Sequence, residues 1–149
     1  MTQQLTISYL RLAKQTLQTE DQQLMQAAEE ATSLAYAPYS HFHVGCALLL
    51  EDGKIIRSAN QENAAYPQCV CAEVSGINTA AMSCPGKKII KIFITSTPAL
   101  NQVLGPCGQC RQTLLEYERR QQQDIQIGLS CGEEIVLFSA VRDLLPFAF

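Results

Sequence analysis

Two short segments contain residue types that suit a metal-dependent enzyme. Cys71-Ala72-Glu73 opens one expected helix, and Pro106-Cys107-Gly108-Gln109-Cys110 opens another. Cys107 and Cys110 are three positions apart, so on a helix they share a face and can bind one metal ion together. Helix amino termini lower thiol pKa values, which favours the thiolate that binds zinc. With Cys71 as a third ligand, the fourth position of a tetrahedral zinc site stays open for catalysis.

Glu73 adds a proton-transfer group to this expected site. It follows Cys71 by two residues, and two such positions reach one metal ion only in the first turn of a helix. A carboxylate there can take a proton from a water molecule that zinc activates and deliver it to a substrate. The pattern predicts a hydrolytic deaminase, with Glu73 as the catalytic residue and Cys71, Cys107 and Cys110 as the ligands of Zn²⁺.

Other roles for the seven cysteines remain open at this point. The Cys107 and Cys110 pair is also compatible with a redox dithiol, because Cys-x-x-Cys serves thiol exchange as well. Cys69 competes with Cys71 as the third ligand, although only Cys71 has a glutamate two residues later. The remaining three lie in no motif and are expected as small buried side chains: Cys46, Cys84 and Cys131.

Length and composition exclude several classes of protein. A chain of 149 residues with 47% apolar and 17% charged residues predicts one globular domain over residues 1–149. No apolar stretch approaches the roughly 20 residues of a membrane span, and no export signal precedes Leu12, so we expect a cytoplasmic protein with reduced cysteines and no membrane partner. The net charge of -3 disfavours a polynucleotide and favours a small-molecule substrate.

Periodic patterns predict the elements that must position these residues. The first half of the chain predicts a helix from Thr19 to Ala35, capped by Thr19, and a hairpin of strands Val44 to Leu50 and Lys54 to Ala59 around Glu51-Asp52-Gly53. The segment Leu5 to Leu12 stays open between strand and helix.

The second half alternates between the two kinds of element. It predicts a helix from Cys71 to Met82, a buried strand from Lys88 to Thr95, a helix beginning beside Cys107, and strands near Asp124 to Ser130 and Glu133 to Ser139. The resulting order α-β-β-α-β-α-β-β predicts an α/β fold with a single mixed sheet layered by helices.

Four motifs follow one another along the chain: Ala37-Pro38-Tyr39-Ser40-His41-Phe42-His43-Val44-Gly45, Asn60-Gln61-Glu62-Asn63-Ala64-Ala65-Tyr66-Pro67, Cys71-Ala72-Glu73, and Pro106-Cys107-Gly108-Gln109-Cys110-Arg111-Gln112. In these motifs and their order the chain resembles the small homotetrameric cytidine deaminases, from roughly Thr19 to Phe149. The resemblance implies a three-layer α-β-α fold with a mixed five-stranded sheet. It also implies zinc-dependent hydrolysis of cytidine and deoxycytidine to uridine and deoxyuridine plus ammonia, a step of pyrimidine salvage.

The resemblance also implies roles for residues that bind substrate. By position, Asn60 and Glu62 bind the ribose hydroxyls and Phe42 packs on the pyrimidine. The remaining substrate-binding positions are Ala72, Tyr66 and Phe149, and the last two match positions that complete a neighbouring subunit's pocket. A homotetramer with shared active sites is therefore implied. His41 and His43, which flank Phe42, are expected as structural polar groups instead of metal ligands.

One residue departs from the family pattern. Tetrameric members usually carry an arginine directly after Cys-Ala-Glu, where it hydrogen-bonds the zinc thiolates, whereas this chain has Val74. Arg111 is the nearest basic residue in sequence to the second motif. Two other functions remain open: deamination of another aminopyrimidine nucleoside such as blasticidin S, and a zinc-stabilised binding domain without turnover.

Overall fold

The central sheet is built around a hairpin close to the predicted one. In the computed structural model, which describes residues 1–149, β2 (His43–Leu50) and β3 (Ile55–Ala59) pair antiparallel. The connecting turn places Gly53 at a φ of 82°, a conformation that glycine adopts without steric cost. The hairpin predicted from the sequence is therefore confirmed.

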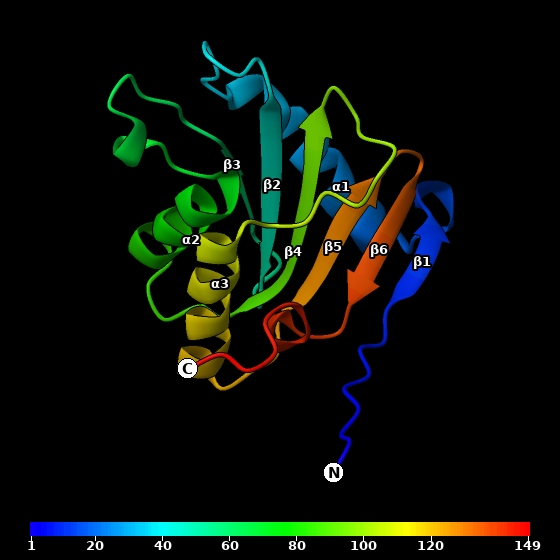
Figure 1. Ribbon diagram of the computed structural model, residues 1–149. Helices are drawn as coiled ribbons and strands as arrows, with labels where there is room; N and C mark the ends of the chain where they lie inside the picture. Colours follow the sequence, from blue (N-terminus) through cyan, green and yellow to red (C-terminus); the bar gives the residue numbers. More distant parts are fainter.

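Three further strands extend this hairpin into a mixed sheet. They are β4 (Ile89–Thr97), β5 (Gln126–Cys131) and β6 (Glu134–Phe138). With β1 (Leu10–Ala13) at one edge, the full strand order is β1-β6-β5-β4-β2-β3 (Figure 1). Only β4 and β5 are parallel neighbours, and α3 (Gly108–Gln121) makes the crossover between them. The predicted mixed α/β architecture is confirmed.

The sheet has six strands, so the expected count of five is wrong. The additional strand, β1 (Leu10–Ala13), pairs antiparallel with β6, for example Leu10 with Leu137. It comes from the end of the segment that the sequence left open between strand and helix. Its partner lies more than a hundred positions away in the chain, and no local pattern of four residues identifies such a pairing.

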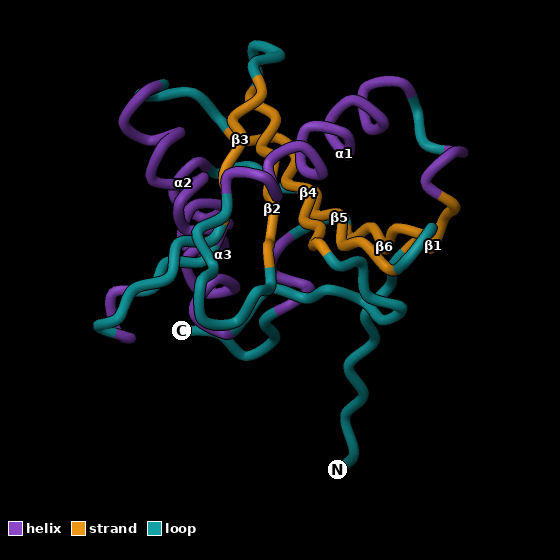
Figure 2. The backbone as a smooth tube through the Cα atoms, turned by 90° about the horizontal axis from the view of Figure 1, so that it is seen from above, coloured by secondary structure: helices purple, strands orange, loops and turns teal.

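Helices cover both faces of the sheet, which confirms the three-layer fold (Figure 2). α1 (Thr19–Ala31) lies on one face, and α2 (Ala72–Ser83) and α3 lie on the other. α1 ends earlier than predicted, and a 3₁₀ turn over Thr32–Leu34 follows. The predicted cap is wrong, because Thr19 is already helical and Gln18 precedes it without a side-chain hydrogen bond. No helix combines the length and apolar character that crossing a bilayer requires.

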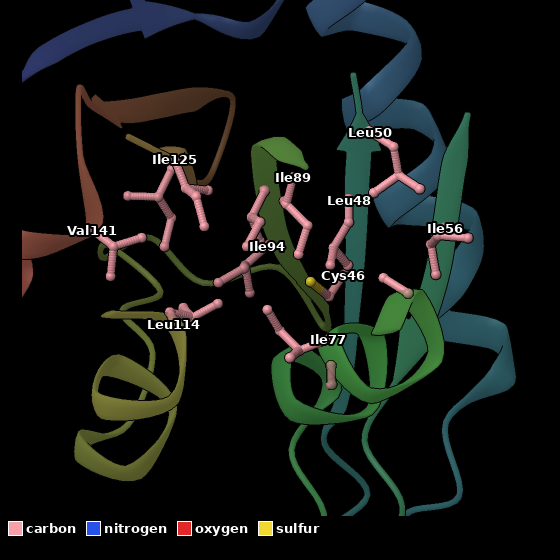
Figure 3. Close-up of a cluster of buried hydrophobic side chains, with 14 of the residues drawn as sticks. Cys46, Leu48, Leu50, Ile56, Ile77, Ile89, Ile94, Leu114, Ile125 and Val141 are labelled. Carbon is pink, nitrogen blue, oxygen red and sulfur yellow. The ribbon is translucent and has the colours of Figure 1, made fainter. Parts of the chain in front are cut away.

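Alternate residues of β2 supply two separate cores. Leu48 and Leu50 belong to the larger cluster, between the sheet and helices α2 and α3 (Figure 3), whereas Ala47 and Leu49 pack with α1. This alternation is the period-two geometry of a strand buried on both faces. The larger core holds α2 and α3 against the sheet, and their amino termini carry the residues that the motifs singled out.

Candidate active site

The three predicted zinc ligands meet at the amino termini of two helices. Cys71 occupies the N-cap position of α2, Cys107 occupies the N-cap position of α3, and Cys110 lies in the first turn of α3. Their three Sγ atoms all lie within 4.8 Å of one another. The Cys110 amide donates to the Cys107 Sγ at 3.4 Å, so the backbone of α3 supports one of the sulfurs. The structure thus brings together side chains from two separate motifs.

The donor set fits zinc. Ligands at a Zn–S distance of about 2.3 Å in a tetrahedron lie about 3.8 Å apart. The Sγ atoms of Cys71 and Cys107 are 3.9 Å apart, which is close to that value. Hydrogen bonding with Cys110 lowers the pKa of the Cys71 thiol to about 7, and the same contact raises the pKa of Cys110. Three cysteines leave one position of a tetrahedral zinc ion to substrate chemistry.

Two residues that the motifs do not include hold α2 in place. The Ser58 hydroxyl on β3 donates to the Ala72 carbonyl at 2.7 Å, which ties the first turn of α2 to the sheet. Gly76 faces the sheet so closely that an added Cβ would lie 2.5 Å from both the Leu48 side chain and the Ser58 hydroxyl. Neither contact has a sequence signal, because each depends on the final packing of α2 against β2 and β3.

Glu73 is the predicted catalytic residue and is a buried carboxylate, with 5% of its surface exposed. It forms no ion pair with a lysine or arginine. Burial is the main cause that raises the pKa of Glu73 above its usual value. A raised pKa makes the carboxyl group a better proton acceptor, which suits a general acid–base residue.

A cavity of about 300 Å³ connects these groups with the predicted substrate-binding residues. Cys71, Cys107 and Glu73 lie at its wall, together with Phe42, Asn60, Glu62 and Ala72. The sequence reading missed the rest of the lining, which is Ser40, Val44, Ile94, Leu104 and Gly105. Leu104 and Gly105 come from the β4–α3 connection, where no periodic pattern indicates which residues face inward.

Asn60 and Glu62 also organise the loop that carries Phe42. The Asn60 Oδ1 accepts from the Val44 amide at 2.8 Å, and its Nδ2 donates to the Phe42 carbonyl at 3.0 Å. The Glu62 Oε2 accepts from the backbone amides of Tyr39 and Ser40 at 2.9 and 3.2 Å. Hydrogen bonding, first from the Ser40 hydroxyl and then from these amides, lowers the pKa of Glu62. Its other oxygen, Oε1, accepts from no backbone amide.

Two predicted substrate-binding residues lie outside this cavity in their own chain. Tyr66 is 83% exposed and lines an adjoining hollow of about 590 Å³, which shares Asn60, Glu62 and Cys71 with the cavity. Phe149 is 96% exposed and lies at the far end of α3, where its backbone oxygen accepts from Arg119 at 2.6 Å. Their predicted contribution to a neighbouring subunit stays a prediction.

The structure distinguishes among the other cysteines. Cys69 does not join the triad, and its Sγ instead accepts from the Asn63 amide at 3.3 Å. All seven thiols are free, including the pair that also suited a redox role. Cys46 and Cys131 are buried as expected, but the expectation is wrong for Cys84, which is partly exposed. Cys84 follows α2, where its Sγ lies 3.1 Å from the Lys54 ammonium.

Val74 stands where tetrameric family members usually have an arginine, and no other basic side chain takes over that arginine's contact with the cysteines. The Arg111 guanidinium donates to the carbonyls of Pro106 at 2.9 Å and Leu144 at 3.1 Å. No lysine or arginine in the chain hydrogen-bonds Cys71, Cys107 or Cys110. His41, with a φ of 55°, and His43, at the start of β2, also lie outside the cavity lining.

Comparison with known proteins agrees with this geometry. The sequence model described as "cytidine and deoxycytidylate deaminase zinc-binding region" matches residues 18–123. A cytidine deaminase of Mycobacterium tuberculosis is 35% identical over 127 residues, which cover 82% of this chain and 84% of the relative. One of Halalkalibacterium halodurans is 36% identical over 128 residues, covering 86% of this chain and 92% of the relative.

Solved structures extend the agreement to the fold. The crystal structure of a cytidine deaminase from Burkholderia pseudomallei matches with a TM-score of 0.74 and 36% identity, over 86% of this chain and 98% of that one. The residues matched by the family model include the three cysteines, Glu73 and Asn60. On these grounds the chain belongs to the family of cytidine and deoxycytidylate deaminases.

Proposed function

We propose that this chain is a zinc-dependent enzyme that hydrolyses cytidine and deoxycytidine to uridine and deoxyuridine with release of ammonia, a reaction of pyrimidine salvage. One observation carries the proposal: the buried Glu73 shares a single cavity with two cysteines of the triad and with Asn60 and Glu62. The cavity thus combines a proton-transfer group, metal ligands and polar groups suited to a sugar. Its volume of about 300 Å³ suits a small molecule such as a nucleoside.

The cysteines and Glu73 have separate roles in the reaction. Cys71, Cys107 and Cys110 would hold a zinc ion, which when bound would supply Lewis-acid activation of the water molecule whose oxygen attacks C4 of the pyrimidine. Glu73 takes a proton from that water and delivers it to N3 of the ring. It then takes the remaining proton from the new C4 hydroxyl and passes it to the exocyclic amine, so that the C4–N bond breaks, the C4 carbonyl forms and ammonia leaves. The raised pKa of Glu73 supports both halves of this exchange.

The sugar and base are held by other residues of the cavity lining. Glu62 has an oxygen, Oε1, that accepts from no backbone amide, and Asn60 retains a second amide hydrogen, so each can bind a ribose hydroxyl while it holds the loop. Phe42 offers a ring surface for the pyrimidine, and Ala72, as the first residue of α2, has a backbone N–H without an intrahelical partner.

The test is ammonia release from the zinc-loaded protein. Cytidine, deoxycytidine, cytosine and blasticidin S are offered separately, and zinc content is measured on the same sample. We expect turnover of the two nucleosides well above that of cytosine. Zinc-replete protein that releases ammonia from neither nucleoside overturns the proposal, and turnover of blasticidin S alone reassigns the substrate.

We further propose that the enzyme is a homotetramer whose subunits complete each other's cavities. Exposed aromatic residues support this proposal: Tyr36 and Tyr39 are 56% and 61% exposed, and Tyr66, Phe147 and Phe149 exceed 80%. Light scattering measures the assembly, and deletion of residues 147–149 should reduce activity because a neighbouring cavity loses a wall. A fully active monomer contradicts the proposal.

We also infer a cytoplasmic location and a small nucleoside as the main partner, with neither a polynucleotide nor a membrane. The cysteines bind zinc only as reduced thiols, and all seven are free, which suits a reducing compartment. Extraction with the soluble fraction of native cells tests the location.

A further inference from the structure

A second pocket lies at the opposite ends of the two helices that carry the cysteines. Its volume is about 310 Å³, and its walls come from the carboxyl ends of α2 and α3, the turn at Gly86 and the start of β4. Residues near the carboxyl ends of both helices line it, including Ala81 of α2 and Arg120 of α3. This pocket shares no lining residue with the catalytic cavity.

The lining of this pocket is cationic. It includes Lys87, Lys88 and Arg120 but no aspartate or glutamate. Lys88 and Arg120 form no ion pair within the chain, and Lys87 has only a 3.5 Å contact with the exposed Asp52. Lys54 adds positive charge at the edge, because its Nζ lies 3.1 Å from the Sγ of Cys84, which lines the pocket.

Helix polarity alone does not explain this concentration of charge. Basic residues are favoured near helix carboxyl ends, and α3 has two of them in its last turn. Arg119 has a structural partner, because it donates to the backbone oxygen of Phe149 at 2.6 Å. Arg120 has no such acceptor and instead stacks on Tyr117, with the guanidinium carbon 4.9 Å from the ring centroid.

The stacked arginine and a fixed floor give the pocket a defined shape. A guanidinium that lies over a ring keeps its N–H edge free, and this edge matches two oxygens of a phosphate. The floor is held by Gln121, whose side chain accepts from the Ile89 amide at 3.0 Å and donates to the Ile89 carbonyl at 2.8 Å. Lys88 directly precedes Ile89, so the same contact anchors its backbone.

We propose that this pocket binds the phosphate group of a small phosphorylated molecule. Arg120 and Lys88 are the main contacts, and Lys87 adds charge. A phosphate dianion offsets the three lining cations, and the volume leaves room for a small organic group beyond it. Free inorganic phosphate and a phosphate monoester share this chemistry.

The experiment measures binding by isothermal titration calorimetry on the zinc-loaded protein at fixed ionic strength. The probes are inorganic phosphate and ribose 5-phosphate, which distinguish a free anion from a monoester. The double variant Lys88→Gln/Arg120→Gln removes the main contacts. The matched control Lys14→Gln/Arg57→Gln also removes two positive charges, from ion pairs with Glu29 and Glu30 outside the pocket. Thermal unfolding verifies that each variant is folded.

We expect one saturable site per chain for at least one probe, with affinity at least about tenfold weaker in the pocket variant. The control variant should bind like the parent. Arg120→Lys, which keeps the charge but loses the planar fork, should give an intermediate affinity. Two results overturn the proposal: no saturable binding of either probe up to about 10 mM, or equal affinity in the parent and the pocket variant. The second result would place the phosphate elsewhere, including at the cysteine end.

Discussion

Glu118 is a buried carboxylate whose replacement tests how the carboxyl-terminal part of the chain is held. Only 4% of its surface is exposed. Its Oε2 accepts from the backbone amides of Ile125 at 3.0 Å and Val141 at 2.7 Å. Its Oε1 accepts from the Arg142 amide at 3.2 Å. One side chain on α3 therefore holds both the approach to β5 and the 3₁₀ turn Val141–Leu144.

Glu118→Gln should lower the free energy of unfolding by about 2–4 kcal/mol. The new amide nitrogen cannot accept, so at least one buried backbone N–H loses its acceptor at a cost of about 1–3 kcal/mol. The remaining two hydrogen bonds lose the carboxylate charge, which removes about 1 kcal/mol from each. Relief from burying a charge offsets part of this sum. The smallest loss occurs if the nitrogen takes the place of Oε1, since only the Arg142 amide then lacks a partner.

The assay is urea unfolding of both proteins at pH 7, with protein and zinc concentrations held constant. Glu116→Gln is the matched control, because Glu116 lies on the same helix, is exposed and makes no side-chain hydrogen bond. We expect the control to stay within about 0.5 kcal/mol of the parent. If Glu118→Gln also stays within that range with an unchanged urea dependence, the three amide contacts do not hold this region.

Three further predictions concern the site and the pH dependence of stability. Glu73→Ala should retain one zinc per chain and lose about 100-fold to 10,000-fold in turnover; metal analysis with ammonia release measures both, and near-normal turnover contradicts the role. Asn60→Ala should impair use of cytidine more than residual use of cytosine, and equal losses refute a sugar contact. Burial lowers the pKa of Lys91, but hydrogen bonds and charges from Asp21 and Glu20 outweigh burial and raise it. The stability that these contacts contribute is complete below about pH 10.4 and is lost as the pH rises through the folded-state pKa of Lys91. Lys91→Gln lacks this contribution, so its urea midpoint should fall less steeply at alkaline pH than that of the parent. If the urea midpoints of both proteins fall in parallel with pH, Lys91 makes no such contribution.

The elements that the sequence predicts well are those specified by local patterns. The apolar run in β4 and the turn at Gly53 identify their strands without knowledge of the partners. β1 lacks such a signal, because its pairing with β6 is nonlocal and none of its four residues is buried. The extent of α1 was overestimated because Thr32–Leu34 keep an α-like spacing while they turn as 3₁₀ helix.

In the site, too, local patterns identify some residues, whereas others are set by nonlocal packing. Residue type and spacing identify the cysteines and Glu73, because metal binding limits which side chains can serve and where they must lie on a helix. The supporting contacts of Ser58 with Ala72 and of Arg111 with Leu144 join residues 14 and 33 positions apart. Such contacts arise only once helices and sheet are packed, so no motif contains them.

The charge at the cysteine triad balances without an arginine at Val74. Three thiolates with Zn²⁺ carry a net charge of -1, and each helix amino terminus contributes about +0.5. Cys71 caps α2 and Cys107 caps α3, so two such termini converge on the triad. Their sum is close to zero, and the Cys110 amide supplies a direct hydrogen bond to one sulfur. Because the compensation comes from the backbone, Val74 can be apolar, and the cavity lining contains no cationic side chain that would pair with the Glu73 carboxylate.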